Sequence, residues 1–204
     1  MSEPTSNVRL EAFSDGVFAI ALTLLIIDIK IPPTAEINTT AEFWLALKHM
    51  LPSIFAFVLS FIIILITWVN HHNGAKLIRG TSGSFIYANG LLLLTVVFLP
   101  FPTSLMGEFL LTDHAAPAVV LYNSVIVIQS LAWILVCGSA ISNKLVKNEK
   151  SIAQLELNRK SGFYALGVYS LLALLAFWFP LTIAIITTMS WIFWLIYGIN
   201  LKEE

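Results

Sequence analysis

The stretch RLEAFSDGVFAIALTLL, residues 9–25, opens the first long apolar run of the chain. Asp15 stands at the entry to the uncharged residues 17–27, and Asp28 and Lys30 follow at the far end. Ionisable groups at membrane depth are costly, so they usually face the interior of a helix bundle or a path for water. The stretch therefore predicts a membrane-spanning helix that is central rather than lipid-facing.

The composition of the whole chain is that of a membrane protein. Of its 204 residues, 58% are hydrophobic and 11% are charged, and the mean hydropathy is +0.86. Several apolar stretches reach the roughly 18 residues that indicate a membrane span. Cys137 is the only cysteine, so an intrachain disulfide is excluded. We expect an all-α polytopic protein in the lipid bilayer, with one domain over residues 1–204 and no binding of nucleic acid.

Six transmembrane spans are predicted, each near the ~20 residues that cross the hydrocarbon core. They cover residues 12–31, 43–69, 84–106, 117–141, 162–179 and 180–199. The last two meet at Pro180, which predicts a tight hairpin, and the polar stretch 142–161 is expected to be a loop.

The distribution of basic residues predicts that both chain ends lie inside the cell. With six spans, Lys30 and Lys48 fall on the outer side. The inner segments hold the other nine basic residues, which are Arg9, Lys76, Arg79, Lys144, Lys147, Lys150, Arg159, Lys160 and Lys202. This is a firm positive-inside bias.

The first span carries a nearly apolar stripe on one helical face. The stripe consists of Phe13, Ile20, Thr23, Leu24 and Ile27, at helical spacings. One interpretation is packing against neighbouring helices. The other is a pore wall, because closely packed membrane helices prefer small residues, whereas symmetric apolar rings close a conduction path by dewetting.

Asp15 needs a partner from another helix, because Glu11 one turn earlier repels it. The end of the second span, TWVNHHN (residues 67–73), is predicted to lie at the same depth. Its candidate partners for Asp15 and Ser14 are Trp68, Asn70, His71, His72 and Asn73. A metal or haem site on the two histidines is the less favoured alternative, because adjacent helical side chains point about 100° apart. We predict a polar network, with no metal and no cofactor.

Arg9, Phe13, Ser14 and Asp15 form the pattern Arg-x-x-x-Phe-Ser-Asp at the start of the first span. This pattern resembles the signature of the transmembrane protein 175 family, the lysosomal potassium channels of animals and their bacterial and archaeal relatives. The resemblance implies one six-helix unit per chain, a homotetramer, and a pore lined by the first helix. It also implies that the signature contributes to a polar network joining the helices.

The same resemblance implies roles for residues further along the first helix. The family's hydrophobic constriction maps onto Ile20, with Leu24 and Ile27 on the same face, and Thr23 matches the family's pore-lining hydroxyl layer. Asp28 either concentrates cations at the outer mouth or pairs with Lys30; both interpretations stay open.

These observations predict a passive, leak-like channel permeable to potassium ions in the plasma membrane of a bacterium or archaeon. The chain has no Thr-Val-Gly-Tyr-Gly filter and no arginine-rich voltage sensor. A cation- or proton-coupled secondary transporter is the alternative, although no internal repeat is visible. A membrane enzyme ranks last, because no nucleophile–base pair occurs.

Overall fold

The computed structural model describes residues 7–33 and 37–200, apart from the side chains of Asp28, Phe193 and residues 196–200. These ranges fold mainly into helices. The helices are α1 (Asn7–Leu24), the 3-10 helix η1 (Leu25–Asp28), α2 (Thr40–His49), α3 (Leu51–Ala75), α4 (Gly83–Phe98), α5 (Pro100–Phe109), α6 (Ala115–Ser142), α7 (Glu149–Leu175) and α8 (Pro180–Asn200).

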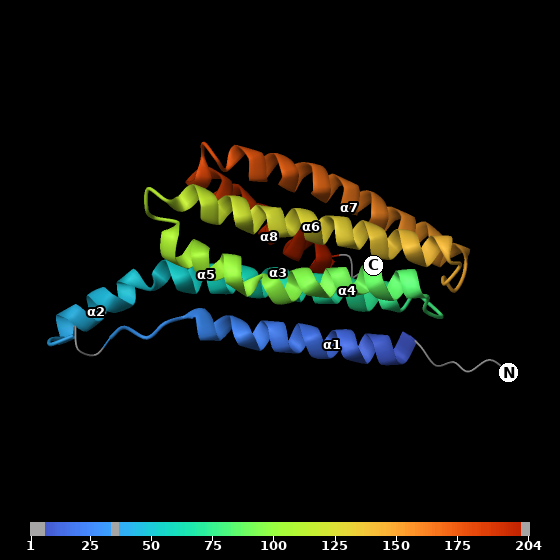
Figure 1. The fold of residues 1–204 in the computed structure, drawn as a ribbon, viewed down its shortest axis with the longest axis horizontal. Helices are drawn as coiled ribbons and strands as arrows, with labels where there is room; N and C mark the ends of the chain where they lie inside the picture. Colours follow the sequence, from blue (N-terminus) through green and yellow to red (C-terminus); the bar gives the residue numbers. More distant parts are fainter. Residues whose placement is uncertain (1–6, 34–36, 201–204) are drawn as a thin grey trace.

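The long helices form an elongated bundle in which α6 is the most extensively packed helix. It packs against α4, α5, α7 and α8, while α3 packs against α1, α5 and α8. α1 lies along one edge of the bundle, beside α3 and α4 (Figure 1). Within the most apolar part of each span, 50% of the residues are buried in α6 but only 22% in α1. Of the four helices that are long and apolar enough to cross a membrane, the first is therefore the one that its own chain covers least.

Four stretches of the described chain are long and apolar enough to cross a membrane. They are Asn7–Ile27, Leu51–Ala75, Gly83–Phe109 and Ala115–Ser142. They correspond to the first four predicted spans. The fifth and sixth predicted spans fall on α7 and α8, which a connection of residues 176–179 joins into the expected hairpin. That these two helices also cross the membrane stays a prediction.

The helices of the structure do not begin and end where the first three spans are predicted to do so. The first begins at Asn7 rather than at 12, and its last turn is the 3-10 helix η1. The predicted span 43–69 is two helices, with a break at Met50. Pro52 has no N–H to bond with the carbonyl of Lys48, so a continuous helix is disfavoured there. Likewise, Pro100 at the start of α5 separates it from α4 within the predicted span 84–106.

α2 stands outside the bundle core and has no buried residue. It begins with a capping box, in which Thr39 Oγ1 accepts from the backbone N–H of Glu42, and Glu42 Oε2 accepts from that of Thr39. The backbone N–H groups of Asn38 and Thr39 lower the pKa of the Glu42 carboxyl. α2 therefore has its own N-terminal cap and is a helix separate from α3.

The polar stretch 142–161 is predicted to be a loop, but in the structure most of it is helical. α7 begins at Glu149, because Asn148 caps it by accepting a hydrogen bond from the backbone N–H of Ser151 at 2.9 Å. The connection before it pairs with the loop between α3 and α4. There, Arg79 donates its backbone N–H to Leu145 and Lys147 donates to Leu77. The two connections at this end are thus tied together.

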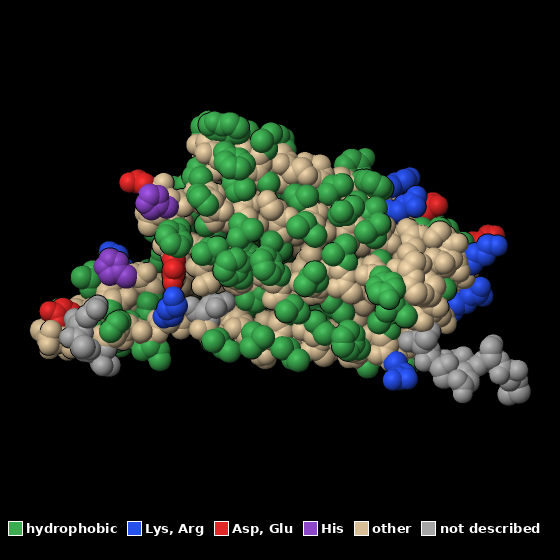
Figure 2. Space-filling model, viewed as in Figure 1, with side chains coloured by type: hydrophobic (Ala, Val, Ile, Leu, Met, Phe, Trp, Pro, Cys, Tyr) green, Lys and Arg blue, Asp and Glu red, His purple; other side chains and the backbone are tan. Residues whose placement is uncertain are grey.

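Charged side chains gather at the two ends of the molecule, and apolar side chains cover the middle (Figure 2). We call the end where α1 begins the basic end. It carries Arg9 near the start of α1, Lys76 and Arg79 after α3, and Lys144 and Lys147 before α7, all predicted to lie inside the cell. Lys202 lies outside the described residues. This distribution agrees with a bilayer around the middle of the bundle; which end faces the cytoplasm stays a prediction.

Candidate pore helix and its polar network

One face of α1 is buried against the rest of the chain. Ser14, Phe18, Ala21 and Leu25 recur at spacings of four, three and four, and each is at most 1% exposed. These residues face α3 and α4, the main neighbours of α1. The periodicity of a helix therefore fixes which residues of α1 point away from its own chain.

The opposite face of α1 is the predicted apolar stripe. The side chains of Phe13, Ile20, Leu24 and Ile27 are 62%, 59%, 42% and 68% exposed. Thr23 is exposed on the same face, and its hydroxyl donates to the carbonyl of Ile20 at 2.9 Å. The bond leaves the lone pairs of the Thr23 oxygen available as acceptors. The stripe is therefore largely uncovered by its own chain. This excludes the interpretation that it packs against neighbouring helices of the same subunit.

Asp15 binds the second span through the indole of Trp68. Trp68 Nε1 donates to Asp15 Oδ1 at 2.8 Å, a distance typical of a hydrogen bond to a charged acceptor. The Trp68 ring stacks on His72, with ring centroids 5.7 Å apart and an interplanar angle of 20°. His72 Nδ1 in turn lies 3.4 Å from Glu11 Oε1, within reach of an ion pair when the imidazole is charged. The acidic entrance of α1 is thus held against the end of α3.

Ser14 joins the network through a residue that the sequence did not single out. Asn89 on α4 is 1% exposed, and its Nδ2 donates to Ser14 Oγ at 3.0 Å. Its Oδ1 lies 2.8 Å from His71 Nε2. Because an amide oxygen only accepts, His71 Nε2 carries the hydrogen in this pair. Ser14 completes the chain by donating to the carbonyl of Leu10 at 2.8 Å. Three helices therefore share one buried hydrogen-bonded chain.

Asn89 carried a usable signal, because a lone amide within the apolar run of the third span needs a partner. The other predicted network residues behave differently. Asn70 is exposed and lines a cavity away from Asp15, and Arg9 is exposed in the first turns of α1. The network that the structure forms is thus Ser14, Asp15, Trp68, His71 and Asn89.

An ion pair lies just beyond η1, at the end of the first span away from Asp15. Lys30 Nζ lies 2.7 Å from Glu108 Oε1 on α5, so Lys30 contacts a carboxylate of another helix. The side chain of Asp28 lies outside the described residues, and its role as an outer-mouth acid stays a prediction.

The two histidines of the segment 67–73 have different neighbours. No group of three His, Cys, Asp or Glu side chains in the described part of the chain is arranged to hold an ion. His71 instead bonds to an amide, and His72 stacks on an indole. Cys137 is a free buried thiol among apolar side chains.

Fold and site together define a multi-pass, all-helical membrane protein whose first helix is anchored by a polar network and exposes an apolar stripe. Comparison with known proteins identifies its family. Residues 9–100 match the family model described as the endosomal/lysosomal potassium channel TMEM175. A solved structure from Chamaesiphon minutus, described as a homologue of the lysosomal potassium-selective channel TMEM175, is similar. The TM-score is 0.84 and the identity is 32%, and the match covers 94% of this chain and 97% of the other. The chain belongs to the TMEM175 family.

Two curated bacterial relatives carry the name potassium channel. The one from Chamaesiphon minutus is 46% identical over 123 residues, which is 60% of this chain and 60% of the relative. The one from Streptomyces collinus is 42% identical over 126 residues, covering 61% and 60% respectively. The matched region thus spans about three fifths of each relative's length.

Proposed function

We propose that the chain forms a passive, potassium-permeable cation channel, as a homotetramer in the plasma membrane, with α1 of each copy lining the pore. The names of the bacterial relatives and of the similar solved structure support the choice of ion. The proposal treats the chain as an ion channel without a cofactor and not as an enzyme.

The observation that carries the proposal is the two-sided character of α1. One face is buried and bonded to α3 and α4, and the opposite face exposes Ile20, Leu24 and Ile27. A helix that only needed to face lipid would not require two partner helices to hold its orientation through buried polar groups. In the proposed tetramer, that orientation directs the stripe to the symmetry axis.

The chemistry of the stripe suits leak-like, moderately selective permeation. Rings of Ile20, Leu24 and Ile27 would narrow the path and resist wetting, which sets a barrier for hydrated ions. The Thr23 hydroxyls lie between these rings and supply oxygen ligands for a partly dehydrated cation. The sequence has no Thr-Val-Gly-Tyr-Gly filter of backbone carbonyls, so the discrimination between potassium and sodium is expected to be modest.

Ion flux from liposomes tests this function. Purified protein is reconstituted in potassium-loaded vesicles, and efflux is recorded with sodium and caesium as competing ions. We expect flux that does not saturate at low turnover, and a higher flux with weaker discrimination for Ile20→Asn, because an amide ring is easier to wet. Ile20→Val keeps an apolar ring and serves as the matched control.

Two outcomes would count against the channel. Silent vesicles that contain correctly folded tetramers would remove ion conduction altogether. Saturable, coupled uptake at low turnover would favour the secondary transporter instead.

A further inference from the structure

An open groove runs along the surface of α6 near the basic end, between α4 and α7. α6 packs against both of these helices, which flank it in Figure 1. The volume of the groove is about 740 Å³, within the range of roughly 300–1,000 Å³ that is typical of ligand pockets. Its outer side is uncovered, because Tyr87 on one wall is 82% exposed and Phe163 on the other is 56% exposed.

The polarity of the groove changes along its length. α4 and α7 run away from the basic end, and α6 runs towards it. The polar lining residues therefore lie at the basic end, and they are Ser84, Ser139 and Arg159. Towards the middle of the bundle the lining is apolar and includes Leu91, Leu135 and Phe163. A polar head followed by an apolar tail is the pattern of a phospholipid.

The apolar part continues along α6 beyond the groove. Leu135, Leu131 and Ile128 precede Ser139 at spacings of four, four and three, so they share its face of the helix. Their side chains are 44%, 43% and 45% exposed. The eleven residues from Ile128 to Ser139 rise by roughly 16 Å, which is about half of the ~30 Å hydrocarbon core. The track is therefore long enough for one acyl chain of one leaflet.

Arg159 gives the groove its charge. The described residues of the lining include no Asp, Glu, Lys or His. The Arg159 side chain is half-buried, and none of the ion pairs in the described part of the chain involves it. A half-buried charge without a partner is unfavourable, so an anion in the groove is favoured. The guanidinium matches phosphate in particular, because its N–H groups donate to two phosphate oxygens at once.

Hydroxyl groups beside Arg159 extend the recognition to the rest of a headgroup. Asn143 Nδ2 donates to Ser84 Oγ at 3.0 Å, which fixes Ser84 next to the end of α6. The Ser139 hydroxyl donates to the carbonyl of Val136 at 3.0 Å, so its oxygen can still accept a hydrogen bond. The described lining offers no carboxylate for the ammonium group of a zwitterionic lipid. An uncharged headgroup that carries hydroxyls therefore fits better.

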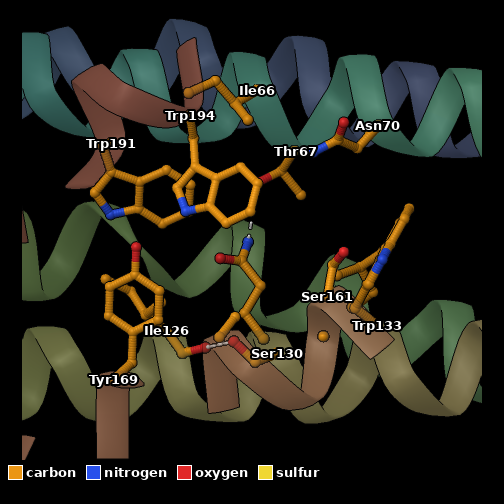
Figure 3. A pocket seen from close by; sticks show the side chains of 14 residues that line it. Ile66, Thr67, Asn70, Ile126, Ser130, Trp133, Ser161, Tyr169, Trp191 and Trp194 are labelled. Carbon is orange, nitrogen blue, oxygen red and sulfur yellow. Dashed lines mark hydrogen bonds between the residues drawn. The ribbon is translucent and has the colours of Figure 1, made fainter. Parts of the chain in front are cut away.

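The aromatic cavity of Figure 3 is less suited to this ligand. It lies on another face of α7, and Trp133, Tyr169, Trp191 and Trp194 are among its lining residues. The described residues around it include no charged side chain. A phosphate there would be desolvated without a counter-charge, which is strongly unfavourable.

We propose that the groove binds one anionic phospholipid of the phosphatidylglycerol class, in the leaflet at the basic end. The phosphate pairs with Arg159, the glycerol headgroup contacts Ser84 and Ser139, and one acyl chain lies along the exposed apolar track of α6. The groove is formed by helices other than α1, so lipid binding does not depend on the proposed ion conduction.

Native mass spectrometry of the full-length protein measures this binding. The protein in detergent micelles is titrated separately with phosphatidylglycerol and with phosphatidylcholine of the same acyl chains, and the lipids retained per chain are counted. We expect tight binding of phosphatidylglycerol to saturate at one lipid per chain. Its affinity should exceed that of phosphatidylcholine roughly fivefold, which is the typical effect of one basic residue on an anionic lipid.

Two pairs of variants locate the site. Arg159→Gln is expected to weaken phosphatidylglycerol binding roughly tenfold, because it removes a hydrogen-bonded charge. Lys160→Gln removes the same charge at the next, exposed position outside the lining, and its effect should stay below roughly threefold. Gly138→Leu fills the floor of the groove and should abolish tight binding of both lipids. Gly167→Leu adds the same side chain to α7 in open space and should change nothing.

Each measurement has a result that overturns the site. Equal binding of the two lipids by the wild-type protein would reject selection by Arg159. Equal losses in Arg159→Gln and Lys160→Gln would assign the preference to the general surface charge of the basic end. Tight binding that persists in folded Gly138→Leu would place the lipid elsewhere. A changed number of subunits for this variant in the same spectra would show instead that the groove is an interface between copies of the chain.

Discussion

Replacing Trp68 by phenylalanine tests the hydrogen bond between Trp68 and Asp15, which holds the first half of α1 against α3. The variant keeps an aromatic ring to stack on His72, but it removes the Nε1–H that reaches Asp15 Oδ1 at 2.8 Å. Asp15 is half-buried, and no other side chain among the described residues donates a hydrogen bond to its carboxyl group. The variant therefore leaves a carboxylate at the edge of the apolar region without its partner.

The expected loss of stability follows from the hydrogen-bond energies that are typical of soluble proteins and of membrane helices. Hydrogen bonds to charged groups contribute about 1.5–3 kcal/mol in soluble proteins. Bonds between membrane helices average about 0.6 kcal/mol and reach about 1.7, because the unfolded state in the membrane also finds partners. Asp15 is an acidic residue that is only partly buried, so Trp68→Phe is expected to lower the free energy of unfolding by about 1–2 kcal/mol.

Reversible unfolding in mixed detergent micelles measures this loss. Trp178→Phe is the control, because the Trp178 side chain is 65% exposed in the connection between α7 and α8, and its effect should stay within about 0.5 kcal/mol. A double-mutant cycle with Asp15→Ala, which removes the acceptor, isolates the pair. If Trp68→Phe behaves like Trp178→Phe, or if the two network substitutions are simply additive, Asp15 and Trp68 do not hold the helices together.

Two other substitutions test the packing around α1 and α3. Asn89→Ala is expected to lower the free energy of unfolding by about 2–3 kcal/mol, because it strands Ser14 and His71 in a buried site; a loss below that of Trp68→Phe in the same titration would contradict the buried chain of bonds. Gly107→Ala would place a methyl group 2.8 Å from Ser53 Cα and should cost about 1–3 kcal/mol, whereas Gly167→Ala meets no heavy atom within 4 Å and should be neutral or slightly stabilising. Equal melting temperatures for the two alanine variants would refute the close approach of α3 and α5.

The local features of the first helix were predictable from the sequence. Helical spacing alone grouped Ile20, Leu24 and Ile27 on one face, and the structure leaves that face exposed. The cost of a membrane-buried acid pointed Asp15 towards the segment that holds Trp68, and the structure joins the two. Both inferences rest on short-range geometry and on the energetic cost of an unpaired polar group, which act in the same way in any membrane helix.

The features that were missed depend on contacts between distant segments. Asn89 lies on the third span, and nothing local indicates that its amide bridges Ser14 and His71. Asn70 was assigned to the network because it lies close in sequence to Trp68, but residues two apart on a helix point about 200° apart. It therefore lines the cavity on the other side of α3.

The positions of the helix ends near Pro52 and Pro100 were also not predictable from the sequence. Pro52 and Pro100 were visible in the sequence within predicted spans, yet only the structure shows that the helix ends before each of them. Proline is tolerated in the first turn of a helix as well as at a kink, so the residue alone does not decide between one bent span and two helices.

Cysteine accessibility at the stripe provides the decisive test of a pore built from α1. In a Cys137→Ser background, which removes the only native thiol, Ile20→Cys, Ile27→Cys and the control Leu171→Cys on α7 are treated with a charged, water-soluble thiol reagent during potassium flux. The Leu171 side chain is 55% exposed and that of Ile20 is 59% exposed. The two positions are therefore equally accessible in the single subunit and differ only in where they lie. We expect the reagent to block flux through the Ile20 and Ile27 variants and to leave the Leu171 variant unaffected. Unchanged flux in both stripe variants, with reaction confirmed by mass spectrometry, would place the stripe outside the ion path.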